Sequence, residues 1–167
     1  ADTEKILEVD EEVQPENLLI TLIDLDLNNL ETIEVNRVGE GRYTLIPFGN
    51  GTFKVANLPG VSIMTNAAQS IRFSLMLFTS NDIVSEGENA ADFGFDYPQA
   101  YCTITAGEEQ VVLILGDQSP DGSASYIMRE GEPKVYLVQS YLTEMLFADL
   151  YSIREKTLPL VTINALT

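Results

Sequence analysis

The chain is built from short strand-like segments that are separated by glycine-bearing turns. Three such segments, in which apolar and polar side chains alternate, occupy residues 32–35, 42–46 and 52–55. Gly39 and Gly41 lie in the turn between the first two segments. A period of two is the pattern of a strand with one buried face, and tight turns pair neighbouring strands. This part of the chain is therefore predicted to form an antiparallel β-meander.

A second series of strand-like segments follows in the C-terminal half of the chain. Its members occupy residues 100–105, 110–115, 125–129 and 134–138. The connections between them contain Gly107, the loop 117–123 and Gly131. The same reasoning predicts a second antiparallel meander. The pattern leaves open whether the two meanders form one sheet or two.

A helix is predicted between the meanders, over residues 62–78. Its apolar side chains recur at helical spacing, and Ser62 precedes them as a candidate N-cap. The stripe expected to pack on the sheet is Met64, Ala68, Ile71 and Leu75. Near the C-terminus, Ser140 and Asp149 are candidate caps for two short helices, over residues 140–147 and 149–154.

These patterns predict an α+β fold with two antiparallel β-meanders, a central helix and a short C-terminal helical pair. Residues 18–157 form the predicted domain or repeat unit. Residues 1–17 contain seven acidic side chains and one basic one, Lys5, and are predicted to be a flexible, solvated lead-in. Residues 158–167 are predicted to be an extended end that could begin a second unit.

Composition excludes several function classes. The 167 residues contain 26 acidic and 9 basic side chains, no histidine and one cysteine, and carry a net charge of −17. Without histidine there is no Ser-His-Asp triad and no His-bearing zinc site. A single cysteine cannot form an internal disulfide. The charge repels phosphate backbones and anionic headgroups, so neither nucleic acid nor lipid is an expected partner of this domain.

One loop resembles the beginning of a calcium-binding loop. Asp117, Ser119 and Asp121 place oxygen atoms at alternate positions before Gly122. However, the twelfth position is Met128, where a bidentate glutamate would be required. Asp and Gly also suit an ordinary hairpin connection. We therefore assign the loop to a turn and expect no metal and no cofactor.

Carboxylates are the only candidate catalytic groups. Asp92 and Asp96 flank Gly94 and could act as the acid pair of a glycosidase, or could accept backbone hydrogen bonds in a turn. A carboxylate-based hydrolase that uses Asp92, Asp96, Asp117 or Asp121 is the alternative function. The turn interpretation is preferred, and no catalytic residue is assigned.

Two other features have structural explanations. Cys102 alternates with Ile104 in a predicted strand, which indicates a small buried apolar side chain. Arg154 and Lys156 follow the last predicted helix and could dock an acidic partner. Compensation of charge at the C-terminal end of the helix is the preferred interpretation for these two bases.

An ordered series of motifs resembles the bacterial domain of unknown function numbered 4340. The motifs are Ala-Asp-Phe-Gly-Phe-Asp-Tyr-Pro at 91–98, Val-Leu-Ile-Leu-Gly-Asp at 112–117, Tyr126, Lys-Val-Tyr-Leu-Val at 134–138, and Leu-Tyr-Ser-Ile-Arg-Glu-Lys-Thr at 150–157. The residues that carry the resemblance are scaffold residues: Gly94, Pro98, Gly116, Asp117, Tyr126, Tyr136, Arg154 and Lys156. Phe95 and Glu155 depart from the usual Leu and Asp, and Phe53 lies near the place of a common Trp.

This resemblance implies properties that composition does not reveal. Family members resemble membrane-anchored proteins whose domain lies outside the cytoplasm, and they are often encoded beside ABC transporters of the gliding-motility type. Some members carry two copies of the unit. We therefore expect a non-catalytic extracytoplasmic module, anchored by a segment outside these residues, that assists an ABC-type transport system by binding a membrane protein. The subunits of the ABC transporter are the candidate partners.

Overall fold

The computed structural model describes residues 19–156. Its strands are β1 (Ile20–Thr21), β2 (Leu30–Arg37), β3 (Gly41–Phe48), β4 (Thr52–Val55), β5 (Thr79–Ser80), β6 (Ile83–Ser85), β7 (Ala100–Ala106), β8 (Glu109–Gln118), β9 (Ala124–Arg129) and β10 (Val135–Gln139). Its helices are α2 (Thr65–Leu77), α3 (Ser140–Leu146) and α4 (Leu150–Ile153), with single 3-10 turns η2 (Leu27–Asn29) and η3 (Ala90–Phe93). The predicted lead-in at 1–17 and the extended end at 158–167 lie outside the described residues.

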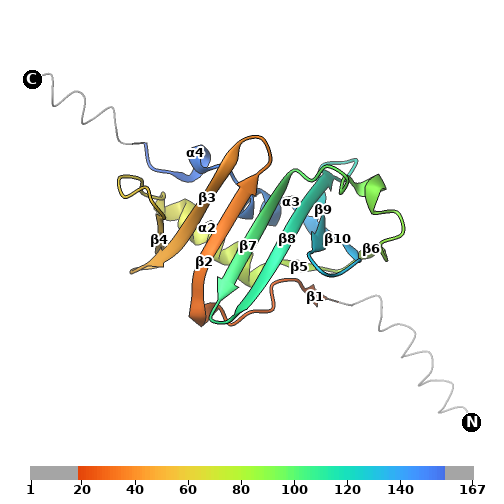
Figure 1. Cartoon of the computed structure of the whole chain (residues 1–167), viewed down its shortest axis with the longest axis horizontal. Coiled ribbons are helices and arrows are strands. Elements are labelled where there is room, and N and C mark those ends of the chain that lie inside the picture. Colours follow the sequence, from red (N-terminus) through yellow and green to blue (C-terminus); the bar gives the residue numbers. More distant parts are fainter. Residues whose placement is uncertain (1–18, 157–167) are drawn as a thin grey trace, which may run out of the picture.

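The two meanders form one continuous antiparallel sheet. Its eight strands are ordered β4-β3-β2-β7-β8-β9-β10-β6. The junction is the pair β2–β7, in which Val35 lies opposite Cys102. Figure 1 shows this junction in the middle of the sheet. The predicted α+β class is confirmed, and the question that the sequence left open is answered in favour of one sheet.

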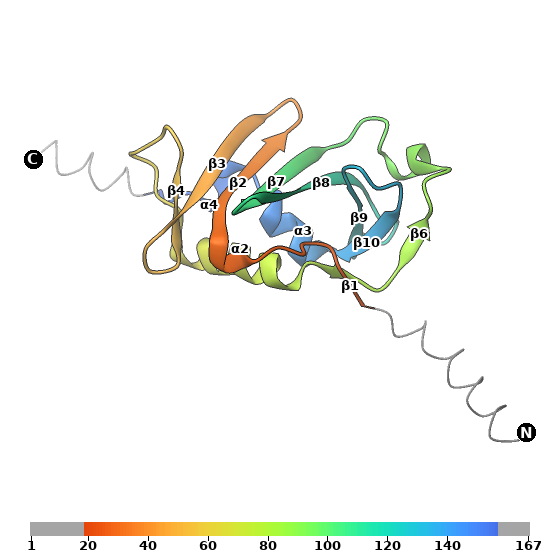
Figure 2. The ribbon, with the colours of Figure 1, turned by 60° about the horizontal axis from the view of Figure 1, so that its bottom comes forward.

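The helices cover one face of the sheet, and the core lies between the two layers. Figure 2 shows the sheet curving over α2 and α3, which lie on the same side of it. Alternate strand residues such as Ile33, Ile104 and Leu113 are completely buried on this face. Burying such side chains is the main favourable contribution to folding, at about 1.5–3 kcal/mol for each one.

The predicted stripe of the central helix is confirmed in its main part. Ala68, Ile71 and Leu75 are buried in the core, whereas Met64 precedes the helix and is partly buried. The opposite face of α2 leaves three large apolar side chains in solvent, namely Phe73, Met76 and Leu77.

Two predicted caps are wrong, and a third is confirmed. The helix α2 begins at Thr65, and the carbonyl of Ser62 instead accepts a hydrogen bond from the N–H of Glu155 at 2.8 Å. Ser140 is the first residue of α3, and its hydroxyl donates to the carbonyl of Gly122 at 2.9 Å. Asp149 caps α4 as predicted, because its carboxylate accepts a hydrogen bond from the N–H of Ser152 at 2.8 Å.

Candidate functional site

Four of the motif residues meet where the end of β8 contacts the loop 90–98. Gly94 has a φ of +89°, and a Cβ there would lie 2.5 Å from Cγ of Asp117. A Cβ on Gly116 would overlap the carbonyl oxygen of Phe93 and lie 2.9 Å from Cζ of Phe95. Both glycines are therefore needed for close packing. We call Gly94, Gly116, Asp117 and Tyr126 the motif cluster.

Aromatic contacts complete this packing. The ring of Tyr126 lies 4.7 Å from that of Phe93, centroid to centroid, at an angle of 57°. Pro98 ends the loop, and the next residue, Gln99, donates its N–H to the carbonyl of Leu115 at 2.9 Å. The contacts of the motif cluster thus hold the loop on the sheet, which is the scaffold role predicted for these residues.

Tyr136, the remaining aromatic motif residue, belongs to a separate polar network on β9 and β10. Its hydroxyl donates to Glu132, and Arg129 donates to the same carboxylate at 2.9 Å. Burial of Glu132 opposes ionisation, but these hydrogen bonds hold the pKa of its carboxylate below the ordinary value. The network closes the turn between the two strands.

The four candidate catalytic carboxylates are on the surface. Asp92, Asp96, Asp117 and Asp121 are all exposed, and none of them lines either of the cavities described below. Asp117 packs against Gly94 in the motif cluster. A general acid needs a raised pKa, which an enclosed and desolvated position provides. These positions provide no such enclosure.

The loop 117–123 has the hydrogen bonds of a turn. The Oδ1 atom of Asp121 accepts from the Ser123 N–H at 3.0 Å and from the hydroxyls of Ser119 and Ser123 at 2.8 Å. These hydrogen bonds lower the pKa of the Asp121 carboxylate, and the bond from the N–H of Ser123 has the largest effect. Across residues 19–156, no group of three or more Asp, Glu or Cys side chains could hold a metal ion.

Cys102 is buried, as predicted, and has no exposed surface. Burial raises the pKa of its thiol far above the ordinary value, because a thiolate would lose its hydration in the core. The nucleophilic form of cysteine is the thiolate. Cys102 therefore acts as a small core side chain and offers no nucleophile.

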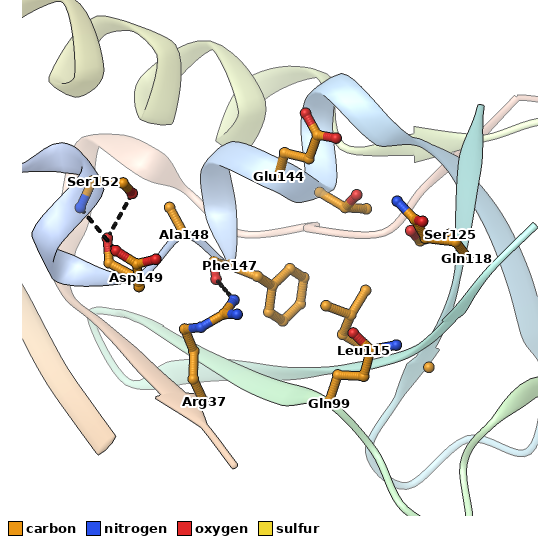
Figure 3. A pocket seen from close by; sticks show the side chains of 12 residues that line it. Arg37, Gln99, Leu115, Gln118, Ser125, Glu144, Phe147, Ala148, Asp149 and Ser152 are labelled. Atoms are coloured by element: carbon orange, nitrogen blue, oxygen red, sulfur yellow. Dashed lines mark hydrogen bonds between the residues drawn. The ribbon is translucent and has the colours of Figure 1, made fainter. Parts of the chain in front are cut away.

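A polar cavity of about 390 Å³ lies between the sheet and α3. Figure 3 shows Arg37 pointing from β2 toward the backbone of Phe147, and Glu144 projecting from α3. The Arg37 guanidinium donates to the carbonyl of Phe147 at 2.6 Å and pairs with Glu40 at 3.1 Å. Asp149 uses its carboxylate as a helix cap. The charged groups here mainly fasten α3 and α4 to the sheet.

Tyr43 strengthens the same attachment. Its hydroxyl donates to the carbonyl of Ala148 at 2.5 Å, and burial raises the pKa of its phenol above the ordinary range. Arg37 and Tyr43 thus connect adjacent strands to the chain between α3 and α4. The cavity can admit a small polar molecule, but no nucleophile among the residues that line it is activated by a neighbouring base.

A larger and more apolar groove of about 1000 Å³ runs beside β4, the first strand of the sheet. We call it the β4 groove. Three segments form it: residues 46–56 of the β3–β4 hairpin, residues 57–63, and the first half of α2. Phe53, Ile63 and Ala68 are buried at its base, whereas Phe48 and Leu58 are exposed at its rim. Sequence reasoning missed this groove.

Two basic side chains line the β4 groove. The ammonium of Lys54 lies 4.6 Å from the centroid of the Phe48 ring, and the guanidinium of Arg72 lies 4.8 Å from that of Phe53. Arg72 also donates to the carbonyl of Gly51 at 2.7 Å, which fixes the hairpin on α2. The groove therefore combines aromatic surface with positive charge.

The motif bases Arg154 and Lys156 lie at the border of this groove. Arg154 pairs with Ile63 in a single antiparallel bridge, and Glu155 lines the groove. The guanidinium of Arg154 and the ammonium of Lys156 lie 4.9 Å and 4.7 Å from the ring of Tyr151. Both cations thus lie over the Tyr151 ring, beyond the C-terminal end of α4, whose last turn contains no basic residue.

Within residues 19–156, no helix has both the length and the apolar composition needed to cross a membrane.

Comparison with known proteins identifies the family. The family model described as "Domain of unknown function (DUF4340)" matches residues 54–164. This match begins within β4, includes the central helix and the whole motif cluster, and covers more than half of the chain. No curated protein and no solved structure matches the chain. The resemblance inferred from the ordered motifs is confirmed, and the chain belongs to the DUF4340 family.

Proposed function

We propose that this domain is a non-catalytic extracytoplasmic module that assists an ABC-type transport system by binding one of its protein subunits. In this proposal a segment outside residues 1–167 anchors the chain in the membrane. The location, the anchor and the kind of partner come from the family resemblance. The binding role has a separate physical basis in the β4 groove.

The observation that carries the binding role is the exposed apolar surface at this groove. Phe48 is 54% exposed and Leu58 is 43% exposed, although both are large apolar side chains. Contiguous apolar surface rimmed by polar groups is typical of protein interaction sites. A partner that covered these side chains would gain about 25 cal/mol for each Å² of apolar area removed from water.

The carboxylate-hydrolase alternative has weaker support. Its four candidate acids are exposed and lie outside both cavities. If the binding role is correct, an Asp→Asn change at Asp92 or Asp96 should leave transport in cells unchanged. Loss of transport in a variant that still folds and still captures the transporter would favour the hydrolase.

Site-specific crosslinking in cells tests the binding role directly. A photo-reactive phenylalanine derivative is placed at Leu58, in the β4 groove, or at Tyr97, which is 90% exposed on the loop 90–98. The full-length anchored protein is irradiated in membranes, and the adducts are identified by mass spectrometry. We expect ABC transporter subunits in the adducts from position 58 and not in those from position 97. Their absence from the adducts of both positions would refute the proposal.

A further inference from the structure

The charge around the β4 groove is opposite to that of the rest of the domain. Residues 19–156 contain 19 acidic and 8 basic side chains. Two of the eight basic side chains, Lys54 and Arg72, line the groove. Glu155 is the one acidic residue among those that line this groove. The groove is therefore a local basic region on an acidic molecule.

Lys54 is available to a ligand, whereas the guanidinium of Arg72 already donates to the carbonyl of Gly51. Arg37 and Arg129 each form an ion pair with a glutamate, at 3.1 Å and 2.9 Å. Within the part of the chain that the structure describes, Lys54 and Arg72 form no ion pair and lie against aromatic rings instead. An incoming carboxylate would meet the exposed ammonium of Lys54 beside the ring of Phe48.

From this combination we propose that the β4 groove binds an extended protein segment that carries both apolar and acidic side chains. The inference rests on the proposed function, because it names the class of partner segment for the same site. Apolar side chains of the segment would cover Phe48 and Leu58, which are exposed, and a carboxylate would pair with Lys54. The segment would lie in the groove between the β3–β4 hairpin and α2, because the outer edge of β4 is partly covered by the bridge between Lys54 and Ser62.

The charge of the groove allows the proposed binding to be distinguished from non-specific electrostatic association. A molecule of charge −17 attracts basic peptides and repels acidic ones over its surface as a whole. Preference for an acidic peptide can therefore arise only from a local site that overcomes the overall field. A non-specific electrostatic association would show the opposite preference.

Two synthetic peptides serve as probes. The acidic probe is fluorescein-labelled Gly-Val-Glu-Val-Glu-Val-Gly, blocked at its C-terminus, and the basic probe has lysine in place of each glutamate. Fluorescence anisotropy measures the binding of each to the folded domain at 0.15 M salt. We expect the acidic probe to bind at least about tenfold more tightly than the basic one.

Matched variants locate the binding. Lys54→Glu should weaken binding of the acidic probe about tenfold, and Leu58→Ala should weaken it about threefold. The controls Lys134→Glu and Leu77→Ala change the same residue types outside the groove, and Leu77 is 41% exposed against 43% for Leu58. These controls should change the affinity less than about twofold. Circular dichroism confirms that each variant is folded.

Three results would overturn the inference: no binding of the acidic probe, equal or tighter binding of the basic probe, or an affinity unaffected by Lys54→Glu. None of them would contradict the proposed function by itself. If the peptides fail while position 58 still crosslinks to transporter subunits, the binding role stands and the acidic class of partner segment is wrong.

Discussion

The close packing at Gly116 leads to a quantitative prediction about stability. Gly116 has no positive φ, so the replacement Gly116→Ala tests steric contact alone. The added methyl group would overlap the carbonyl oxygen of Phe93, a backbone atom that cannot rotate away. Burial of one methyl group contributes at most about 0.8 kcal/mol, and lower entropy of the unfolded chain adds about 0.4–1 kcal/mol. Because the overlap exceeds these gains, we expect a net loss of about 1–3 kcal/mol.

Three other glycines separate the possible causes. Gly60 has free space around it and no positive φ, so Gly60→Ala should change stability by less than about 0.5 kcal/mol. Gly39 has free space but a φ of +81°, so Gly39→Ala should lose about 1 kcal/mol from backbone strain. At Gly94 both causes are present, but the nearest atoms belong to the Asp117 side chain, which can move aside.

Urea unfolding followed by circular dichroism measures all four variants, and the free energy of unfolding is extrapolated to water. Thermal unfolding provides a second measurement, in which Gly116→Ala should lower the midpoint by about 2–12 °C. If Gly116→Ala and Gly60→Ala have the same stability within about 0.5 kcal/mol, the steric argument for the motif cluster is refuted.

Further predictions concern the caps, the cysteine and the polar network. Asp149→Ala should cost about 1 kcal/mol in urea unfolding, whereas Ser62→Ala should be near neutral because Ser62 does not cap α2. Native Cys102 should not react with a thiol reagent at pH 8 and should react on unfolding; rapid reaction of the folded protein would contradict its burial. Glu132→Gln should destabilise by about 0.2–1 kcal/mol at pH 7. Since the folded pKa of Glu132 is lowered, this difference should disappear as the pH falls through that pKa, and a difference that persists at pH 2 would contradict the assignment.

Local patterns were sufficient to predict most elements. Strand alternation placed segments within β2, β3, β4 and the four strands of the second meander, because each presents one face to the core. The strand β6 was not predicted. With only three residues, Ile83–Ser85, it has too little alternation to detect, and it forms because β10 provides a partner.

Failures occurred where distant segments compete with local preference. Ser62 is a good N-cap residue in isolation, but it pairs with Lys54 in a single bridge, and its carbonyl bonds to Glu155. The chain therefore remains extended there, and α2 begins three residues later. No pattern within a short window contains Glu155, which is why the sequence could not reveal this competition.

The motif cluster and the β4 groove also depend on contacts between segments that are distant in the sequence. The members of the motif cluster were identified singly, through family resemblance, but their contact at the end of β8 depends on tertiary packing. The β4 groove gave no sequence motif, since its walls come from separate segments that include Phe48, Leu58 and Arg72. The available signal for the groove was that basic residues, which are scarce in this sequence, lie near aromatic ones.

Because the molecule as a whole is acidic whereas the β4 groove is basic, salt should have an unusual effect on the affinity of the acidic probe. The Debye length is about 30 Å at 0.01 M salt and about 8 Å at 0.15 M. Repulsion from the distributed acidic surface acts over long distances and is screened first, whereas attraction to Lys54 acts at contact and is screened less. Raising salt from 0.01 to 0.15 M should therefore strengthen binding of the acidic probe or leave it constant, and the association rate should rise. In Lys54→Glu the local attraction is absent, so the residual affinity should rise more steeply with salt. A fall in wild-type affinity over this range, measured by anisotropy, would mean that long-range attraction governs binding and that the groove does not act as a local basic site.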